Sequence, residues 1–198
     1  MRFFALRDLL GQAADSPEVA AAQAAVMASG PVPAILAAQD PAGYWAEPGP
    51  GYYPKYTGTV WQLTFLAQLG ADGGDPRVAA ACDYVLDHTR SRYGGFSAGA
   101  DPAGQIHCLQ GNLVAALIDL GRLGDERLDA ALDWLARSIT GEGIAPAAET
   151  DAAVRHFRSG KSPHGLACRP NVHQPCRWGA VKTKLALGHT PEAARNPE

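Results

Sequence analysis

Four side chains in the segment HGLACRPNVHQPC belong to types that bind soft metal ions: His164, Cys168, His173 and Cys176. They lie within 13 residues, and thiolate sulfur with imidazole nitrogen is the ligand set that tetrahedral zinc prefers. The intervals of three, four and two residues follow no standard zinc motif. The segment is a candidate zinc site; the alternative is that these are small buried cysteines and polar loop histidines.

A second thiol occupies an equivalent place in the chain. Cys108 precedes Gly121 by 13 residues and Cys176 precedes Gly188 by 12, and each glycine ends an apolar segment typical of a buried helix. Both thiols are therefore expected at helix N-terminal ends on one rim of the fold, where the helix dipole lowers a thiol pKa. The predicted zinc ligands are Cys108, Cys168, Cys176 and His173.

Basic residues accompany the metal candidates. Between positions 142 and 176 the chain has a long insertion, where earlier connections have ten to twenty residues, and it contains Arg155, Arg158 and Lys161. Long ordered loops in compact folds are usually functional, and guanidinium and ammonium groups bind diphosphate or carboxylate. We expect these three side chains to hold an anionic head group; the alternative is a solvated flexible loop.

The elements that would position these residues are helices with clear start and stop signals. Ser16-Pro17 and Asp75-Pro76 are capping residues followed by a proline at the first helical position, and Asp125 is a further cap. Segments 57–70 and 108–121 are apolar on nearly every face, which is typical of buried helices. The predicted helices cover 16–30, 33–39, 57–70, 75–88, 108–121, 125–138 and 176–188, and another begins at 190.

These helices repeat along the chain. Gly121 follows Gly70 by 51 residues, and Asp125 follows Asp75 by 50. One buried helix and one amphipathic helix fill each period, which is typical of stacked helical hairpins. Cys82 lies on the apolar stripe of the helix over 75–88 and is expected in the core.

The segment ILAAQDPAGYW, at 35–45, contains Gln39, Gly43 and Trp45 in a spacing that resembles the QW motif of squalene and hopene cyclases. The equivalent segments 84–96 and 134–144 lack the Gln and the Trp at the motif positions. On this motif and the repeat, the chain is identified as a partial or divergent member of the terpenoid cyclase and protein prenyltransferase α/α-toroid superfamily. Another α-solenoid is the alternative.

The resemblance implies an all-α, α/α-toroid-like stack of inner and outer helices in which Gln39 and Trp45 tie neighbouring repeats together. The family's closed ring has six helix pairs, whereas this chain has about three and a half, so an incomplete ring is expected. Its exposed terminal faces would favour self-association. The family also implies that aromatic side chains line a cavity and stabilise cations. The candidates here are Tyr53, Tyr56 and Trp61, for which packing at a repeat junction is the alternative.

The family's acidic motifs are absent from the sequence. Asp72-Gly-Gly-Asp75 is the nearest approach to the cyclase Asp-x-Asp-Asp box, and Asp75 is already assigned as a helix cap. The prenyltransferase zinc ligands include an Asp-x-Cys pair, which this chain also lacks. A carbohydrate-active (α/α) enzyme would need a pair of carboxylates across a cavity, and the sequence identifies none.

Composition limits the remaining functions. A formal net charge of −3 with 19% charged residues is no electrostatic footprint for nucleic acid. The sequence has no apolar run of membrane-spanning length and no secretion signal, so a cytoplasmic location is expected. We expect an N-terminal helix over 1–15 and one repeat domain over 16–198.

Two functions remain open. The first is binding of an apolar, isoprenoid-type ligand by a cyclase-like or prenyltransferase-like domain, with catalysis unproven. The alternative is a non-catalytic helical-repeat module that binds a partner, with a structural Cys/His site that holds zinc.

Overall fold

The structure is a computed structural model, and it describes residues 1–92, 94–99, 104–140, 166–168 and 171–191, with the backbone alone over 167–168 and 171–175. These residues form an all-α fold, as expected, with two small additions of β structure. The helices are α1 (Arg2–Phe4), the π-helix η1 (Ala5–Leu9), α2 (Pro17–Ala28), α3 (Val32–Ala37), α4 (Thr59–Leu69), α5 (Pro76–His88), α6 (His107–Asp119), α7 (Glu126–Thr140) and α8 (Arg177–His189).

The predicted helix starts are confirmed by their capping bonds. The Ser16 hydroxyl accepts the Val19 N–H at 3.3 Å. Asp75 and Asp125 accept the N–H groups of Arg77 and Arg127, each at 2.9 Å. Side-chain oxygens at these positions satisfy donors that the first helical turn leaves free. The expected helices therefore begin where their caps predicted.

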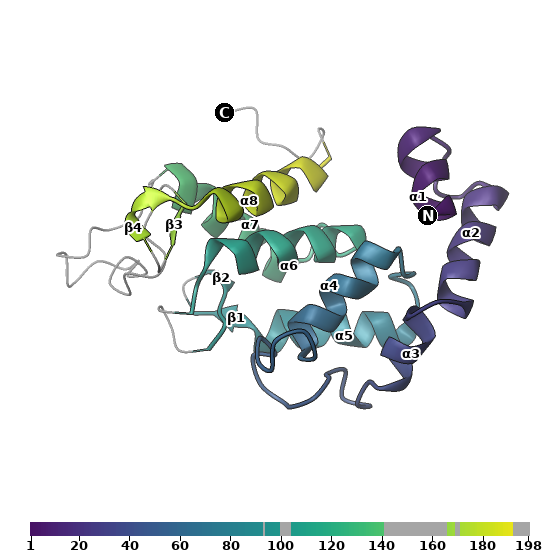
Figure 1. Cartoon of the computed structure of the whole chain (residues 1–198), viewed down its shortest axis with the longest axis horizontal. Helices are drawn as coiled ribbons and strands as arrows, with labels where there is room; N and C mark the ends of the chain where they lie inside the picture. The colour runs from purple at the N-terminus through teal and green to yellow at the C-terminus, as the bar shows by residue number, and fades with distance from the viewer. Residues whose placement is uncertain (93, 100–103, 141–165, 169–170, 192–198) are drawn as a thin grey trace.

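The helices form two rows (Figure 1). The first row consists of α4, α6 and α8, in which α6 contacts both of its neighbours, and the second row consists of α5 and α7, which pack on α4 and α6 respectively. Arg127 of α7 joins the second row by donating to Asp83 and Asp87 of α5, at 2.9 and 2.7 Å. The elements expected to repeat thus lie side by side in chain order.

The core lies between the two rows. Cys82 is buried there, as predicted. Around it the core contains fully buried leucines and valines of both rows: Leu63, Leu66, Leu113, Leu117, Leu128, Leu135, Val78 and Val85. A fully buried Leu or Val contributes about 2 kcal/mol relative to an exposed one. Gly111 allows the closest helix approach, because a Cβ there would lie 2.3 Å from the backbone carbon of Lys182.

The repeat extends to individual hydrogen bonds. Thr59, at the start of α4, accepts the Trp45 N–H and donates to the Trp45 carbonyl. Gln110, at the start of α6 and 51 residues later, makes the same two bonds to Phe96. Trp45 and Phe96 are both buried. One backbone clamp therefore occurs in both repeats, although its side chains differ.

The glycines that precede these aromatic residues also correspond. Gly43, at φ 95°, lies against the backbone of Ala80 in α5, and Gly94, at φ 112°, lies against Trp134 and Ala130 in α7. Gln39 adds a long-range bond, because its amide donates to the Arg77 carbonyl in the first turn of α5 at 2.9 Å. The segment 39–45 therefore joins the first repeat to the helix that follows it.

Two hairpins were not predicted. β1 (Arg90–Ser91) pairs with β2 (Gly94–Phe96), and β3 (Ala167–Cys168) pairs with β4 (Asn171–Pro175), both antiparallel. Each is too short for hydrophobic alternation to indicate it in the sequence. Among the described residues, no helix combines the length and the apolar character that crossing a membrane requires.

Candidate functional site

Four aromatic rings gather at the start of α4. Tyr52, Tyr53 and Tyr56 come from the loop before the helix, and Trp61 comes from its first turn. Ring centroids lie 5.4 Å apart for Tyr52–Trp61, 5.0 Å for Tyr56–Trp61 and 5.1 Å for Tyr52–Tyr53. The three residues that the sequence nominated for ligand binding therefore lie together, and we call these four residues the aromatic cluster.

The outer rings of the aromatic cluster are open to solvent. Tyr53 and Tyr56 are 65% and 64% exposed, whereas Tyr52 is buried. Packing at a repeat junction, the alternative reading of this loop, accounts for Tyr52 but not for two exposed rings, since an aromatic ring in the core would be covered. The cluster thus combines a buried base with an accessible aromatic surface.

Hydrogen bonds hold the loop in this position. The Trp61 indole donates to the Tyr52 carbonyl at 2.8 Å, and the Gln62 amide donates to the Tyr56 carbonyl at 2.7 Å. Gly51 approaches so closely that a Cβ would lie 2.7 Å from Thr59, and its φ of 71° is left-handed. The exposed rings are consequently anchored through the backbone and not by their own contacts alone.

Lys55 connects the aromatic cluster with the thiols. Its ammonium lies 6.0 Å from the centroid of the Tyr52 ring, and its charge acts on Cys108. The sequence analysis missed Lys55 because it lies in the loop before α4, whereas Cys108 lies in α6, 53 residues further along the chain. An exposed cation beside aromatic rings suits a ligand with an anionic head and an apolar body.

Two of the proposed zinc ligands lie at corresponding helix ends. Cys108 is the second residue of α6, and Cys176 is the N-cap of α8, where its sulfur accepts the Gly179 N–H at 3.4 Å. Helices α6 and α8 lie side by side (Figure 1), and the two sulfurs are near enough to influence each other electrostatically. Both thiols are free, and they lie on one rim as the helix alignment indicated.

The expectation that the helix N-terminus activates the thiol is wrong for Cys108. Burial raises the pKa of this thiol, and the neighbouring Cys176 raises it further. Together they outweigh the backbone N–H groups of Leu109 and Cys108 and the charge of Lys55, which lower it. Desolvation disfavours a thiolate more strongly than the helix dipole favours it. The pKa of the Cys108 thiol therefore lies above its ordinary value.

The remaining zinc candidates are described only through their backbone. Cys168 ends β3 opposite Asn171, and His173 lies within β4. Over the part of the chain whose side chains are described, no group of three or more His, Cys, Asp or Glu residues is arranged to hold a metal ion. Of the four proposed zinc ligands, only the thiols of Cys108 and Cys176 are described as side chains, and two thiols are half of a tetrahedral set. The anion-binding candidates Arg155, Arg158 and Lys161 lie outside the described residues.

His107, beside Cys108, is engaged elsewhere. Its Nε2 lies 3.1 Å from the Ser138 hydroxyl of α7, and its ring packs 5.8 Å from Trp134. The side chain is buried. His107 therefore ties α6 to α7.

The nearest approach to an acidic motif consists of turn and capping residues. Asp72 accepts the Gly74 N–H within its own turn, at 2.9 Å. Asp75 caps α5 and forms an ion pair with Arg77 at 2.8 Å, and this hydrogen bond lowers the pKa of its carboxyl. Asp75 is therefore held ionised as a helix cap, and Asp72 serves its own turn.

A second group of functional side chains was missed by the sequence analysis. Arg7, Asp119 and His189 line a cavity at the opposite ends of α4, α6 and α8. Asp119 offered a signal, because an acidic residue that ends an apolar helix opposes the helix dipole. Arg7 and His189 gave none, since their positions beside Asp119 depend on how three distant segments pack.

Comparisons of the chain with protein-family models, with curated proteins and with solved structures gave no match.

Proposed function

We propose that this chain is a helical-repeat domain of the terpenoid cyclase and protein prenyltransferase type that binds an apolar, isoprenoid-like ligand on its aromatic cluster. The repeated clamps at Trp45 and Phe96, and the bond from Gln39 to the next helix, support the relationship. A three-dimensional toroid is part of this proposal. Catalysis is not part of it, because Asp72 and Asp75 serve local structure.

The observation that carries the binding proposal is the exposure of Tyr53 and Tyr56 on a fixed base of Tyr52 and Trp61. Aromatic faces provide large apolar contact area at a low cost in side-chain entropy. Lys55, beside the Tyr52 ring, would contact an anionic head group. The ligand expected is therefore a hydrocarbon chain with a phosphate or diphosphate at one end.

The test is titration calorimetry with farnesyl diphosphate and with farnesol. The double variant Tyr53→Ala/Tyr56→Ala is expected to raise the Kd for both by roughly 10- to 100-fold, since each ring contributes about 1 kcal/mol or more. Lys55→Gln is expected to weaken the binding of farnesyl diphosphate and to leave the Kd for farnesol unchanged. Leu10→Ala removes another exposed apolar side chain outside the cluster, and it is the control. Equal losses in the control and the tyrosine variant would refute the site.

A second function is favoured by α8. Trp178, Val181 and Leu185 lie at i, i+3 and i+7, and they are 63%, 61% and 42% exposed. This spacing places them on one helix face. As the alternative, we propose a non-catalytic interaction module that associates with itself through this face. Sedimentation velocity over a range of concentrations tests it: Val181→Lys should give a monomer where the unchanged chain associates, and a concentration-independent monomer would contradict it.

The alternative of a non-catalytic interaction module also includes zinc, bound as a structural ion. The measurement is zinc per chain in the purified protein, repeated for Cys108→Ser, Cys168→Ser and Cys176→Ser. Close to one equivalent, lost in each variant, is the expected result for a shared site. Zinc retained in Cys108→Ser would separate Cys108, whose thiol pKa is raised, from the ligand set.

A further inference from the structure

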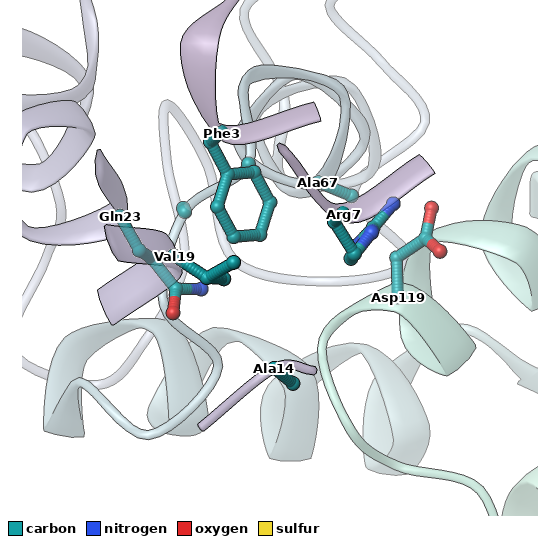
Figure 2. Close-up of a pocket in the computed structure, with 9 residues that line it drawn as sticks. Phe3, Arg7, Ala14, Val19, Gln23, Ala67 and Asp119 are labelled. Atoms are coloured by element: carbon teal, nitrogen blue, oxygen red, sulfur yellow. The ribbon is translucent and has the colours of Figure 1, made fainter. Parts of the chain in front are cut away.

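A cavity of about 490 Å³ lies where the N-terminal residues meet the last turns of α4, α6 and α8. Its size suits a small organic ligand. A smaller cavity of about 170 Å³ adjoins it and shares Arg7, Ala67 and Asp119. Figure 2 shows the smaller cavity, with Arg7 and Asp119 next to each other at one end and Phe3, Val19 and Gln23 at the other. The larger cavity is bordered by Phe4, Arg7, Asp8, Asp119, Leu185 and His189.

The charged groups in this cavity form two pairs. Arg7 donates to both carboxylate oxygens of Asp8, at 2.5 and 3.1 Å. His189 Nδ1 lies 2.8 Å from Asp119 Oδ1. With a neutral imidazole, one cation faces two carboxylates and the formal charge is −1. With a protonated imidazole the charges balance, so these four side chains do not give the cavity a positive charge while both carboxyls are ionised.

Helix dipoles make the same end of the molecule more negative. Asp119 is the last residue of α6 and His189 is the last residue of α8, while Ala67 and Gln68 lie in the last turn of α4. Each helix C-terminus carries about half a negative charge. Three such ends meet at one cavity, and their field repels anions and attracts cations.

Asp119 is a partly buried carboxyl at this end of the molecule. Burial raises the pKa of its carboxyl, and the nearby His189 and Arg7 offset only part of that effect. A carboxylate that is paired well enough would show the opposite shift. The two neighbouring basic side chains therefore do not fully offset the cost of burying the Asp119 carboxylate.

The cavity already contains one cation of the protein's own, the side chain of Arg7. The Arg7 guanidinium is 5.1 Å from the centroid of the Phe3 ring and 5.2 Å from that of Phe4. Aromatic faces attract such cations. Phe4 and Leu185 also give the larger cavity apolar surface, which would cover a hydrocarbon group attached to a ligand's ammonium.

We propose that this cavity binds an organic monocation, an ammonium group on a small hydrocarbon body, with the ammonium at Asp119 and Asp8 and the hydrocarbon against Phe4 and Leu185. The proposal is independent of the aromatic cluster, which lies at the other ends of the same helices. Inorganic cations are disfavoured, because the described residues offer no metal-binding group and the walls are partly apolar.

The first test uses the unchanged protein and three probes of similar shape. Titration calorimetry at neutral pH and low salt compares phenethylamine, which is protonated there, with 2-phenylethanol and with 3-phenylpropionate. Phenethylamine is expected to bind at least 10-fold more tightly than the alcohol, and the carboxylate most weakly. Binding of the carboxylate as tight as that of the amine, or no binding of the amine at millimolar concentration, would overturn the proposal.

The second test uses matched carboxylate variants. Asp119→Asn and Asp8→Asn are each expected to raise the Kd for phenethylamine by 10-fold or more. Asp133→Asn is the control, because that carboxylate is paired with Arg137 on the exposed side of α7. Asp8 is half exposed on the N-terminal helix, so its variant can fold even if Asp119→Asn does not. Unchanged binding in Asp8→Asn, or an equal loss in Asp133→Asn, would overturn the proposal.

Discussion

At the scale of single residues, the repeats are joined by polar side chains that hold the backbone of a buried neighbour. Thr59 and Gln110 hold Trp45 and Phe96 in the same way. Buried N–H and C=O groups need partners, and an unsatisfied one costs about 1–3 kcal/mol. These residues look unimportant in the sequence, because polar side chains in an apolar helix interrupt its pattern. Their function is visible only when the loop they bind is in place.

Gln110→Ala is the corresponding prediction. It leaves both backbone groups of the buried Phe96 without their side-chain partner, and the free energy of unfolding is expected to fall by about 2–4 kcal/mol. Urea denaturation followed by circular dichroism measures it. Gln62→Ala is the control, because its bond to the Tyr56 carbonyl is exposed, and it should cost less than about 1 kcal/mol. Equal costs for the two variants would show that the clamp adds no stability.

At the scale of helices, the first row depends on a close backbone contact between α6 and α8. Gly111 lies directly against the Lys182 backbone, and a side chain there would push the two helices apart. Gly188, near the end of α8, faces open space. The two glycines therefore separate the cost of a helix-packing clash from the helix propensity of alanine.

Gly111→Ala is expected to lower the free energy of unfolding by at least about 2 kcal/mol, because the clash is with backbone that cannot rotate away. Gly188→Ala is expected to be neutral or to stabilise by up to about 1 kcal/mol, since alanine favours the helix. Thermal and urea unfolding measure both. If Gly111→Ala is as stable as Gly188→Ala, α8 is not packed on α6 as described.

The cap of α7 gives a prediction about pH. The hydrogen bond from Arg127 lowers the pKa of Asp125 from 3.8 to about 2. Because the folded-state pKa is lower than the unfolded one, the carboxylate contributes stability above pH 4 that is lost as the pH falls towards 2. The stability difference between the unchanged chain and Asp125→Asn should therefore narrow between about pH 4 and 2.

Urea unfolding at neutral pH and at steps down to about pH 2 checks this window. Asn remains a good N-cap, so the comparison isolates the charge of Asp125. Asp133→Asn, on the same helix, removes an exposed pair and should change the free energy of unfolding by less than about 1 kcal/mol. A difference for Asp125→Asn that stays constant with pH would contradict the ion pair with Arg127.

At the scale of the whole molecule, the two proposed sites lie at opposite ends of the first row. Lys55 and the aromatic cluster lie near the starts of α4 and α6, and Asp119 and His189 end α6 and α8. A helix of 13 residues spans roughly 20 Å, which is beyond direct contact. The sites should therefore behave independently.

The prediction is that each variant weakens the binding of one ligand only. Tyr53→Ala/Tyr56→Ala should weaken the binding of farnesyl diphosphate and leave the Kd for phenethylamine within about 2-fold. Asp119→Asn should weaken the binding of phenethylamine and leave the Kd for farnesyl diphosphate within about 2-fold. Calorimetry of both variants with both probes provides the four values. Each ligand is also expected to bind equally well with the other present. Loss of both ligands in either variant would indicate one shared site or a damaged fold.

Much of this protein was determined by the sequence alone. Caps at Ser16, Asp75 and Asp125, and the apolar pattern of the helices, are local properties, because a turn of helix is specified by residues three and four apart. The all-α class and the repeat of about 50 residues follow from such signals. The grouping of Tyr53, Tyr56 and Trp61 was also predictable, since they are close in the chain.

What only the tertiary structure decided involves residues far apart in sequence. The charge of Lys55 acts on Cys108, and Arg7, Asp119 and His189 line one cavity, because segments far apart in the chain pack together. The raised pKa of Cys108 belongs here as well, since burial is a property of the packed molecule and the helix dipole is a property of one helix. The local sequence therefore predicts the helix or loop in which a residue lies, whereas tertiary packing determines which residues surround it and how its pKa shifts.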